Sequence, residues 1–185
     1  MCLIINTLVL IKMKQIYLSL GSNLGHREQQ LEKALELIQN RIGKLDKISR
    51  IYESEPWGYS STRLFYNCCV SLQTDIAPLD LMEHLLEIER EMGRHREGGG
   101  YRDRIIDIDL LLYGDMCINS PDLVVPHPSM ADRRFVLAPL SEIAARLVHP
   151  VSGATIREML DACADLSELR ALTYRFFSRS PSQNM

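Results

Sequence analysis

Two aspartates stand one residue apart inside an apolar run, in the stretch Ile-Ile-Asp-Ile-Asp-Leu-Leu-Leu that covers residues 105–112. The composition of this run predicts a strand. Side chains alternate along a strand, so Asp107 and Asp109 share one face and lie about 6.5–7 Å apart along it. The other face is left to the apolar side chains of Ile106, Ile108 and Leu110. The pattern therefore predicts a strand that is buried on one face and functional on the other.

Such a pair of carboxylates points to magnesium chemistry. Two negative charges at this spacing repel each other and raise each other's pKa unless a cation lies between them. Mg²⁺ prefers oxygen ligands and keeps positions for water and phosphate, and a carboxylate pair can hold one ion or bridge two. The alternative interpretation is a solvated strand face on which the aspartates pair with Arg102 or Arg104.

A basic, glycine-rich segment precedes the aspartates. Three consecutive glycines, Gly98–Gly100, lie among Arg94, Arg96, Arg102 and Arg104. Guanidinium groups present a planar fork to phosphate oxygens, and glycine lets a backbone approach a ligand closely. Beside an acidic pair, this composition favours a nucleoside triphosphate with magnesium, although no Gly-Lys-Ser/Thr of a P-loop follows. The alternative is a solvated charged loop. We also expect the three glycines to be hinges of a loop that closes over bound substrates.

Composition narrows the class of protein. The chain has 185 residues, 46% of them hydrophobic, which suits one globular domain with a substantial core. A net charge of −3 argues against a general nucleic-acid partner. The five cysteines have no metal-ligand spacing, which indicates free thiols in a reducing compartment. No segment reaches the roughly 20 apolar residues of a membrane span, so we expect a cytoplasmic protein without a membrane partner.

Hydrophobic periodicity predicts the order strand, helix, strand, strand, helix, strand. This order is the split βαβ pattern of a ferredoxin-like α+β sandwich, with helices packed on a mostly antiparallel sheet. Ser22 or Asn23 is expected to cap the first helix. The segment 115–140, with Pro121, Pro126 and Pro128, is expected to be irregular. The expected strands cover 14–20, 46–54, 64–74 and 104–113, the long helices cover 26–42 and 78–93, and short helices cover 141–147 and 155–163.

Five motifs occur in an order that resembles a known family. They are Leu18-Ser-Leu-Gly-Ser-Asn-Leu-Gly25, Tyr52 with Pro56-x-Gly58, Phe65-Tyr-Asn67, Arg104-x-x-Asp107-Ile-Asp109-Leu-Leu111, and Val125-Pro-His-Pro128 with Arg133-Arg-Phe135. Together they resemble the signature of the 6-hydroxymethyl-7,8-dihydropterin pyrophosphokinases over residues 13–147. The resemblance implies transfer of pyrophosphate from ATP to the hydroxymethyl oxygen of the dihydropterin, in folate synthesis, with AMP as the other product. It also implies two Mg²⁺ ions and the ferredoxin-like fold.

The resemblance also implies roles for residues at matching positions. Asp107 and Asp109 would hold both magnesium ions, and Arg94 and Arg104 would neutralise charge on the transferred group. The positions that resemble ATP contacts are Glu89, Arg96, Tyr101, Leu110, His127 and Arg133. Those that resemble pterin contacts are Ser54, Glu55, Trp57, Phe65, Asn67, Tyr101 and Phe135, with Tyr101 and Phe135 stacking on the ring. A solvated role for Glu89, a structural role for His127 and core packing for Phe65 and Trp57 remain alternatives.

This chain departs from the family pattern in the glycine-rich loop. Tyr101 replaces a tryptophan, Gly100 stands where a basic residue is found, and Asp103 stands where a small residue or proline is common. These changes affect loop contacts and affinity more than the type of reaction.

Two other functions remain open. A magnesium-dependent nucleotidyltransferase would release pyrophosphate, and a binding module would have lost catalysis.

For the chain organisation we expect three parts. Residues 1–12 form an N-terminal extension, 13–164 the pyrophosphokinase domain, and 165–185 a C-terminal extension that is partly disordered. The expected partners are small molecules, and we expect a monomer.

Overall fold

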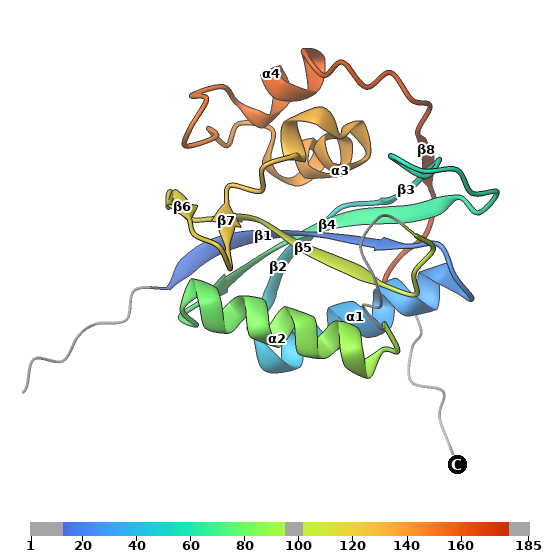
Figure 1. Ribbon diagram of the computed structural model, residues 1–185, viewed down its shortest axis with the longest axis horizontal. Coiled ribbons are helices and arrows are strands. Elements are labelled where there is room, and N and C mark those ends of the chain that lie inside the picture. Colours follow the sequence, from blue (N-terminus) through green and yellow to red (C-terminus); the bar gives the residue numbers. More distant parts are fainter. Residues whose placement is uncertain (1–12, 95–101, 178–185) are drawn as a thin grey trace, which may run out of the picture.

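The computed structural model describes residues 13–94 and 102–177. Figure 1 shows a central sheet with α1 and α2 on one face and α3 and α4 on the other. The strands are β1 (Lys14–Ser22), β2 (Leu45–Ile48), β3 (Ile51–Ser54), β4 (Phe65–Thr74), β5 (Asp107–Tyr113), β6 (Ile118–Asn119), β7 (Val124–Val125) and β8 (Arg170–Leu172). The helices are α1 (Arg27–Arg41), α2 (Pro78–Glu91), the 3₁₀ turn η1 (Met130–Asp132), α3 (Arg134–Ala144) and α4 (Ile156–Asp161). In these described ranges no helix is long and apolar enough to cross a membrane.

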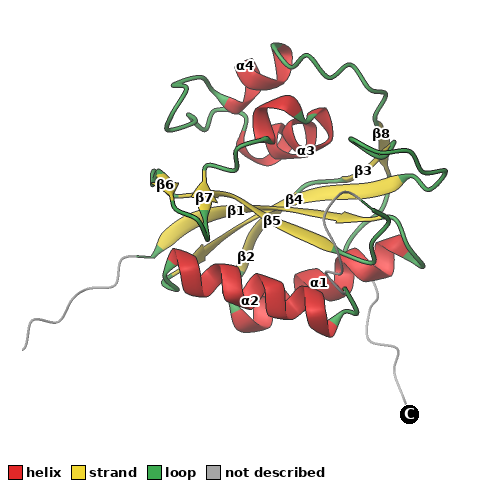
Figure 2. Ribbon diagram, viewed as in Figure 1, coloured by secondary structure: helices red, strands yellow, loops and turns green. Residues whose placement is uncertain are grey.

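The six-stranded sheet has the order β5-β1-β4-β3-β8, and β2 also pairs with β4. Every pairing in it is antiparallel. β1 lies within the sheet between β4 and β5 (Figure 2). Its residues from Leu18 to Ser22 are all buried. The order confirms the predicted α+β fold, because the ferredoxin-like pattern also places its first strand between its third and fourth.

Each face of the sheet carries its own apolar core. The larger core lies under α1 and α2 and takes in Ile108 and Leu110 of β5. The smaller core lies under α3 and α4 and takes in Leu111. Strand alternation explains the division and places the two aspartates of β5 on the α3 side. The adjacent cysteines follow the same rule, since Cys68 packs in the larger core and Cys69 in the smaller.

The single strand predicted over 46–54 is wrong. The segment is split into β2 and β3, and both pair with β4. At the break, the backbone N–H of Ser49 donates to the carbonyl of Cys69, and the Ser49 hydroxyl accepts from the Cys69 N–H. A serine hydroxyl that substitutes for a ladder partner is a local hydrogen-bonding option that a hydrophobic pattern does not reveal.

The irregular segment predicted over 115–140 and the helix predicted over 141–147 are also wrong. The segment contains the β6–β7 hairpin and η1, and α3 begins at Arg134 rather than at 141. Pro139 lies inside α3 and is buried with Val136, Leu137 and Leu140. Proline normally breaks a helix, but here it removes one hydrogen bond in the middle of α3 while the apolar face of the helix packs on β4.

The end of the chain adds to the sheet. Residues 165–169 cross to the far edge, where β8 pairs antiparallel with β3. The adjoining aromatic residues Tyr174 and Phe176 pack against the larger core, and the Tyr174 hydroxyl donates to Glu32. The part of the predicted extension up to Phe177 is therefore ordered by tertiary contacts.

We predict that α2 is anchored through its buried face. Leu85 is fully buried, whereas Leu79 on the same helix is 53% exposed. Leu85→Ala should lower the free energy of unfolding by about 2–5 kcal/mol, because it removes core contacts and leaves a cavity. Leu79→Ala is the matched control and should change it by less than about 0.5 kcal/mol. Urea titrations measure both, and equal effects of the two changes would contradict this packing.

Candidate active site

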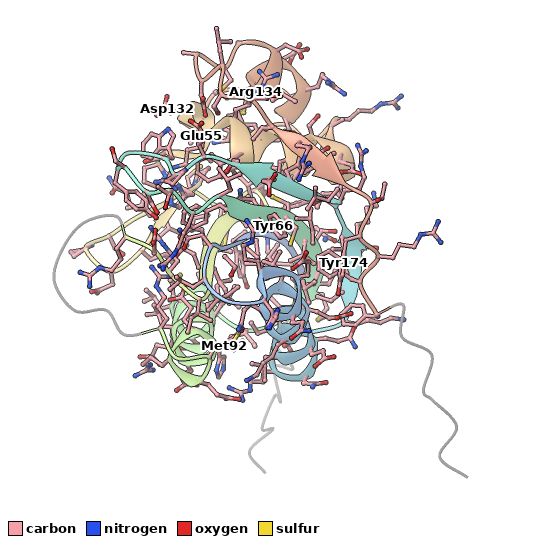
Figure 3. All side chains as sticks on the ribbon, turned by 90° about the vertical axis from the view of Figure 1, so that its right-hand side faces the viewer. Glu55, Tyr66, Met92, Asp132, Arg134 and Tyr174 are labelled. Atoms are coloured by element: carbon pink, nitrogen blue, oxygen red, sulfur yellow. The ribbon has the colours of Figure 1, made fainter. Side chains whose placement is uncertain are left out.

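A recess of about 170 Å³ opens on the α3 side of the sheet. Its walls come from β1, the end of β3 and the loop that follows it, β4, β5 and the start of α3. Figure 3 shows Glu55, at the end of β3, on the α3 side of the sheet, and Met92, just after α2, on the opposite side. The lining residues are Ser19, Gly21, Ser54, Glu55, Trp57, Tyr59, Phe65, Asn67, Arg94, Arg104, Asp107, Asp109, His127, Arg133 and Phe135.

The register of the sheet explains why these residues meet. Asp107 pairs with Gly21 of β1, and Gly21 pairs with Asn67 of β4. Asp109 pairs with Ser19 in the same way. Cross-strand partners point to the same face, so one row of the sheet carries a carboxylate, a glycine and an amide side by side. The two ends of this row are two strands apart, which is roughly 10 Å.

The first aspartate is surrounded by arginines. The guanidinium of Arg94 contacts Asp107 Oδ1 and also Glu89 Oε1. Arg104 Nη1 lies 2.6 Å from Asp107 Oδ2. Glu89 is only 2% exposed, and its Oε1 also accepts the backbone N–H of Ile108 at 2.7 Å. Glu89 therefore ties α2 to the start of β5 and holds Arg94 from behind.

The second aspartate lies in a less compensated environment. Burial, reinforced by the nearby charge of Asp107, raises the pKa of Asp109 to about 7. Arg133 opposes this increase, with its Nη1 3.6 Å from Asp109 Oδ2. A carboxyl group with this pKa is only partly ionised at neutral pH, and an added cation would stabilise its charged form.

His127 lies next to Asp109 and is neutral. Its Nε2 is 4.0 Å from Asp109 Oδ2. Burial, together with the positive charge of Arg133, lowers the pKa of His127 to about 4. The backbone N–H of Ser129 donates to His127 Nδ1 at 3.2 Å, so the ring proton is on Nε2, which faces the recess. His127 can thus donate a hydrogen bond to a ligand without adding charge.

Aromatic side chains form the remaining wall. The guanidinium carbon of Arg133 lies 4.7 Å from the ring centre of Trp57 and 5.9 Å from that of Phe135. The guanidinium carbon of Arg104 lies 5.8 Å from the ring centre of Phe65. Flat rings interleaved with cations suit a planar aromatic ligand that carries phosphate nearby.

Asn67 supplies a fixed polar group in this wall. Its Nδ2 donates to Ser54 Oγ at 2.9 Å and to the Tyr52 carbonyl at 3.4 Å. Its Oδ1 lies only 3.0 Å from where a Cβ on Gly21 would be. Glycine at position 21 therefore leaves the room that the Asn67 amide needs in order to face the recess.

The structure brings together twelve of the residues that the sequence singled out. Two others lie beside the recess rather than in its lining: Glu89 supports Arg94, and Leu110 is buried in the core on the opposite face. Contact of these two with ATP stays a prediction. Arg96, Tyr101 and Gly98–Gly100 lie outside the described residues.

Three lining residues were not predicted. Ser19 and Gly21 could have been found, because alternation along the strand 14–20 places them opposite the apolar Leu18 and Leu20. Tyr59 gave no such signal, since it lies in a loop whose path is set by contacts distant in sequence.

The sequence of the chain is similar to known proteins of one family. A family profile described as "7,8-dihydro-6-hydroxymethylpterin-pyrophosphokinase (HPPK)" matches residues 17–145. The 2-amino-4-hydroxy-6-hydroxymethyldihydropteridine pyrophosphokinase of Porphyromonas gingivalis is 49% identical over 138 residues, which cover 73% of this chain and 93% of that protein. The Bacillus subtilis protein of the same name is 40% identical over 139 residues, covering 75% and 83% respectively.

Solved structures show the same fold. Wild-type HPPK-DHPS of Plasmodium falciparum with SDX-DHP superimposes with a TM-score of 0.69 at 19% identity. The match covers 82% of this chain but 44% of that one, so the chain spans less than half of the Plasmodium protein. With the profile match and the two bacterial relatives, the family is clear: the chain belongs to the 7,8-dihydro-6-hydroxymethylpterin pyrophosphokinases and has their activity in folate biosynthesis.

Proposed function

We propose that the recess transfers pyrophosphate from ATP to the hydroxymethyl oxygen of 6-hydroxymethyl-7,8-dihydropterin and releases AMP. The observation that carries this assignment is the sheet register, which joins the acidic pair to the Asn67 wall in one recess. The phosphates would lie at the acidic end of this recess and the pterin at the aromatic end. Because the two ends are about 10 Å apart, a hydroxymethyl group on the pterin would reach toward the phosphates.

Asp107 and Asp109 are the residues that would hold two Mg²⁺ ions. Both offer carboxylate oxygens to the recess, and burial together with the charge of Asp107 raises the pKa of Asp109, so an added cation would favour its ionised form. Within residues 13–94 and 102–177, no three His, Cys, Asp or Glu side chains gather as a complete metal cage. Two carboxylates suit magnesium, which completes its coordination with phosphate oxygens and water. When bound, the ions supply positive charge that polarises the phosphates and acidifies the attacking hydroxyl.

The arginines supply positioning and charge. Arg94 and Arg104 both contact Asp107, so their guanidinium groups point to the acidic end of the recess. A guanidinium can exchange one carboxylate oxygen for a phosphate oxygen while it keeps its orientation. This preorganised positive charge stabilises the transferred group because it needs little rearrangement during the reaction.

The nucleotide and the pterin would be held by neutral donors and rings. The Nε2–H of His127 and the guanidinium of Arg133 face the recess beside Asp109 and are suited to the nucleotide. Phe135 and Trp57 offer faces for the pterin, with Phe65, Ser54 and Glu55 completing the wall. The Nδ2 group of Asn67 donates to Ser54 and Tyr52, which leaves the amide oxygen to accept a hydrogen bond from the edge of the pterin.

We propose that one chain carries a complete site and acts as a monomer. The described lining residues lie between Ser19 and Phe135 of the sequence. The same span lies within residues 13–164, which we propose as the catalytic domain. Light scattering during size-exclusion chromatography measures the mass, and 21.2 kDa is expected.

The first prediction concerns the products. With ATP, Mg²⁺ and the dihydropterin, the protein should form AMP only when the pterin is present. The Asp107→Ala, Asp109→Ala double variant should lose at least about a thousandfold in kcat, because both magnesium ligands are removed. Asp115→Ala is the control, since this aspartate is 90% exposed and pairs with Lys14 far from the recess. The nucleotide products are separated and identified by chromatography. ADP or pyrophosphate as the product would contradict the proposal.

The second prediction concerns pH. Asp109 must lose its proton to bind Mg²⁺, and its pKa is about 7. Binding of Mg²⁺ with a non-hydrolysable ATP analogue should therefore weaken about tenfold between pH 8 and pH 6. Isothermal titration calorimetry measures this affinity. Asp109→Asn removes the titrating group and corrects for protonation of the nucleotide, so identical pH dependence in both proteins would contradict the assignment.

The third prediction concerns the pterin. Phe135→Ala should weaken pterin binding about tenfold, because one stacking face is lost, and should leave affinity for the ATP analogue within about twofold. Phe177→Ala is the matched control, since this ring is 44% exposed near the end of the described chain. Fluorescence titration with the dihydropterin measures both. Equal weakening of pterin and nucleotide binding would point to a general disturbance of the site instead.

A further inference from the structure

The carboxylate of Asp103 joins three segments that are distant in the sequence. Asn23 Nδ2, just after β1, donates to Asp103 Oδ1 at 2.7 Å. The hydroxyl of Tyr59, in the loop between β3 and β4, donates to the same oxygen at 3.0 Å. Arg63 Nη1, from the same loop, lies 3.1 Å from Asp103 Oδ2. A single side chain before β5 therefore connects the β1–α1 loop with the loop that carries the aromatic wall.

Asn23 links Asp103 to the backbone of Arg104, the arginine that contacts Asp107. The Asn23 side chain is buried, and its Oδ1 accepts the backbone N–H of Arg104 at 2.7 Å. The backbone N–H of Asn23 in turn donates to the Arg104 carbonyl at 3.1 Å. Both backbone groups of Arg104 are thus held by one residue. The expected capping role of Asn23 is wrong, because α1 begins at Arg27 without a side-chain cap.

Asp103 accepts the shortest of the hydrogen bonds that Asn23 Nδ2 donates and helps to orient the amide. A carboxylate can only accept hydrogen bonds, so it favours the NH₂ end of the amide, and the Arg63 carbonyl, which accepts from Nδ2 at 3.4 Å, favours the same end. The amide oxygen then faces the Arg104 N–H. Burial opposes the ionisation of Asp103, but hydrogen bonds from Ser61, Asn23, Tyr59 and Arg63 outweigh it and lower its pKa. The carboxylate is therefore charged at neutral pH.

We propose that Asp103 is a positioning residue for pyrophosphoryl transfer. It orients the Asn23 amide, which fixes the backbone of Arg104 so that the guanidinium stays at Asp107, and it ties Tyr59 of the pterin wall to the same point. This inference rests on the proposed function. The proposed role of Asp103 is particular to this chain, because Asp103 stands where the family pattern commonly has a small residue or proline.

The expected effect is on the rate more than on binding. A reacting group displaced by about 1 Å can lose a hundredfold in rate, whereas ATP keeps its other contacts. Asp103→Ala should therefore lower kcat about tenfold and change KM for ATP by less than about threefold. Asp103→Asn should recover much of this loss, since its amide oxygen still accepts from Asn23 and Tyr59 while the 60% exposed Arg63 turns into solvent.

An exchange of the two side-chain types gives the sharpest test. Asn23→Asp alone places two carboxylates at hydrogen-bond distance, and their repulsion should lower kcat at least about tenfold. Adding Asp103→Asn exchanges the amide and the carboxylate and should restore kcat to within about threefold of wild type. Adding Asp115→Asn instead is the matched control, because it removes the same charge at a distant exposed site, and it should not restore the rate.

Steady-state kinetics of AMP formation and thermal melts are measured for all these variants. Rescue by Asp103→Asn but not by Asp115→Asn supports the inference. The inference is overturned if Asp103→Asn and Asp115→Asn change the kcat of the Asn23→Asp protein equally. It is also overturned if the Asp103→Ala protein has the same kcat as the wild type. If the Asn23→Asp protein does not fold, the kcat values of the Asp103→Ala and Asp103→Asn proteins test the inference. Absence of pterin-dependent AMP from the wild type would instead overturn the proposed function itself.

Discussion

The balance of buried charge around the start of β5 is the constraint on which the active site depends. Three carboxylates, those of Glu89, Asp107 and Asp109, face the guanidinium groups of Arg94, Arg104 and Arg133. Charges that are shielded from water are tolerated in a protein only when they are paired. The ion pairs therefore fix the positions of the side chains that form them. Asp109 is the least compensated member of the group, which makes it the point at which an added cation gains most.

The layered fold makes this arrangement possible. α1 and α2 cover one face of the sheet completely enough that Ile108 and Leu110 are buried there. On the other face α3 begins only at Arg134, and the strand ends beside its first turn remain open to the recess. The same strand thus supplies core on one face and chemistry on the other. Its two aspartates are held in place because Ile108, which lies between them, is packed in the core.

The hydrogen bonds around Asp103 extend this rigidity to the loops. β1, the β3–β4 loop and the segment before β5 are separated by forty to eighty residues in the chain, yet their polar groups converge on one carboxylate. A positioned loop residue can be as important for a transfer reaction as a residue that touches the substrate when catalysis relies on orientation and charge.

Regular elements could be predicted from the sequence where one pattern ran for several turns or strand residues. β1, β4, α1 and α2 all occur within a few residues of the predicted bounds, because their apolar spacing alone determines which face must be buried. The break at Ser49, the helix that continues through Pro139, and β8 could not be predicted. Each depends on contacts with a distant strand that outweigh the local preference of the residues.

The candidate site, like the fold, has a part that could be predicted from the sequence and a part that only the tertiary structure shows. Alternation along β5 was sufficient to pair Asp107 with Asp109, and the ordered motifs were sufficient to identify the activity. The tertiary structure decided that Glu89 supports Arg94, that Gly21 makes room for Asn67, and that Tyr59 and Asp103 meet at Asn23. The physical reason is that a repeating pattern records which face of an element is buried. Hydrogen-bond partners from different segments leave no periodic trace, and only the folded chain brings them within reach of one another.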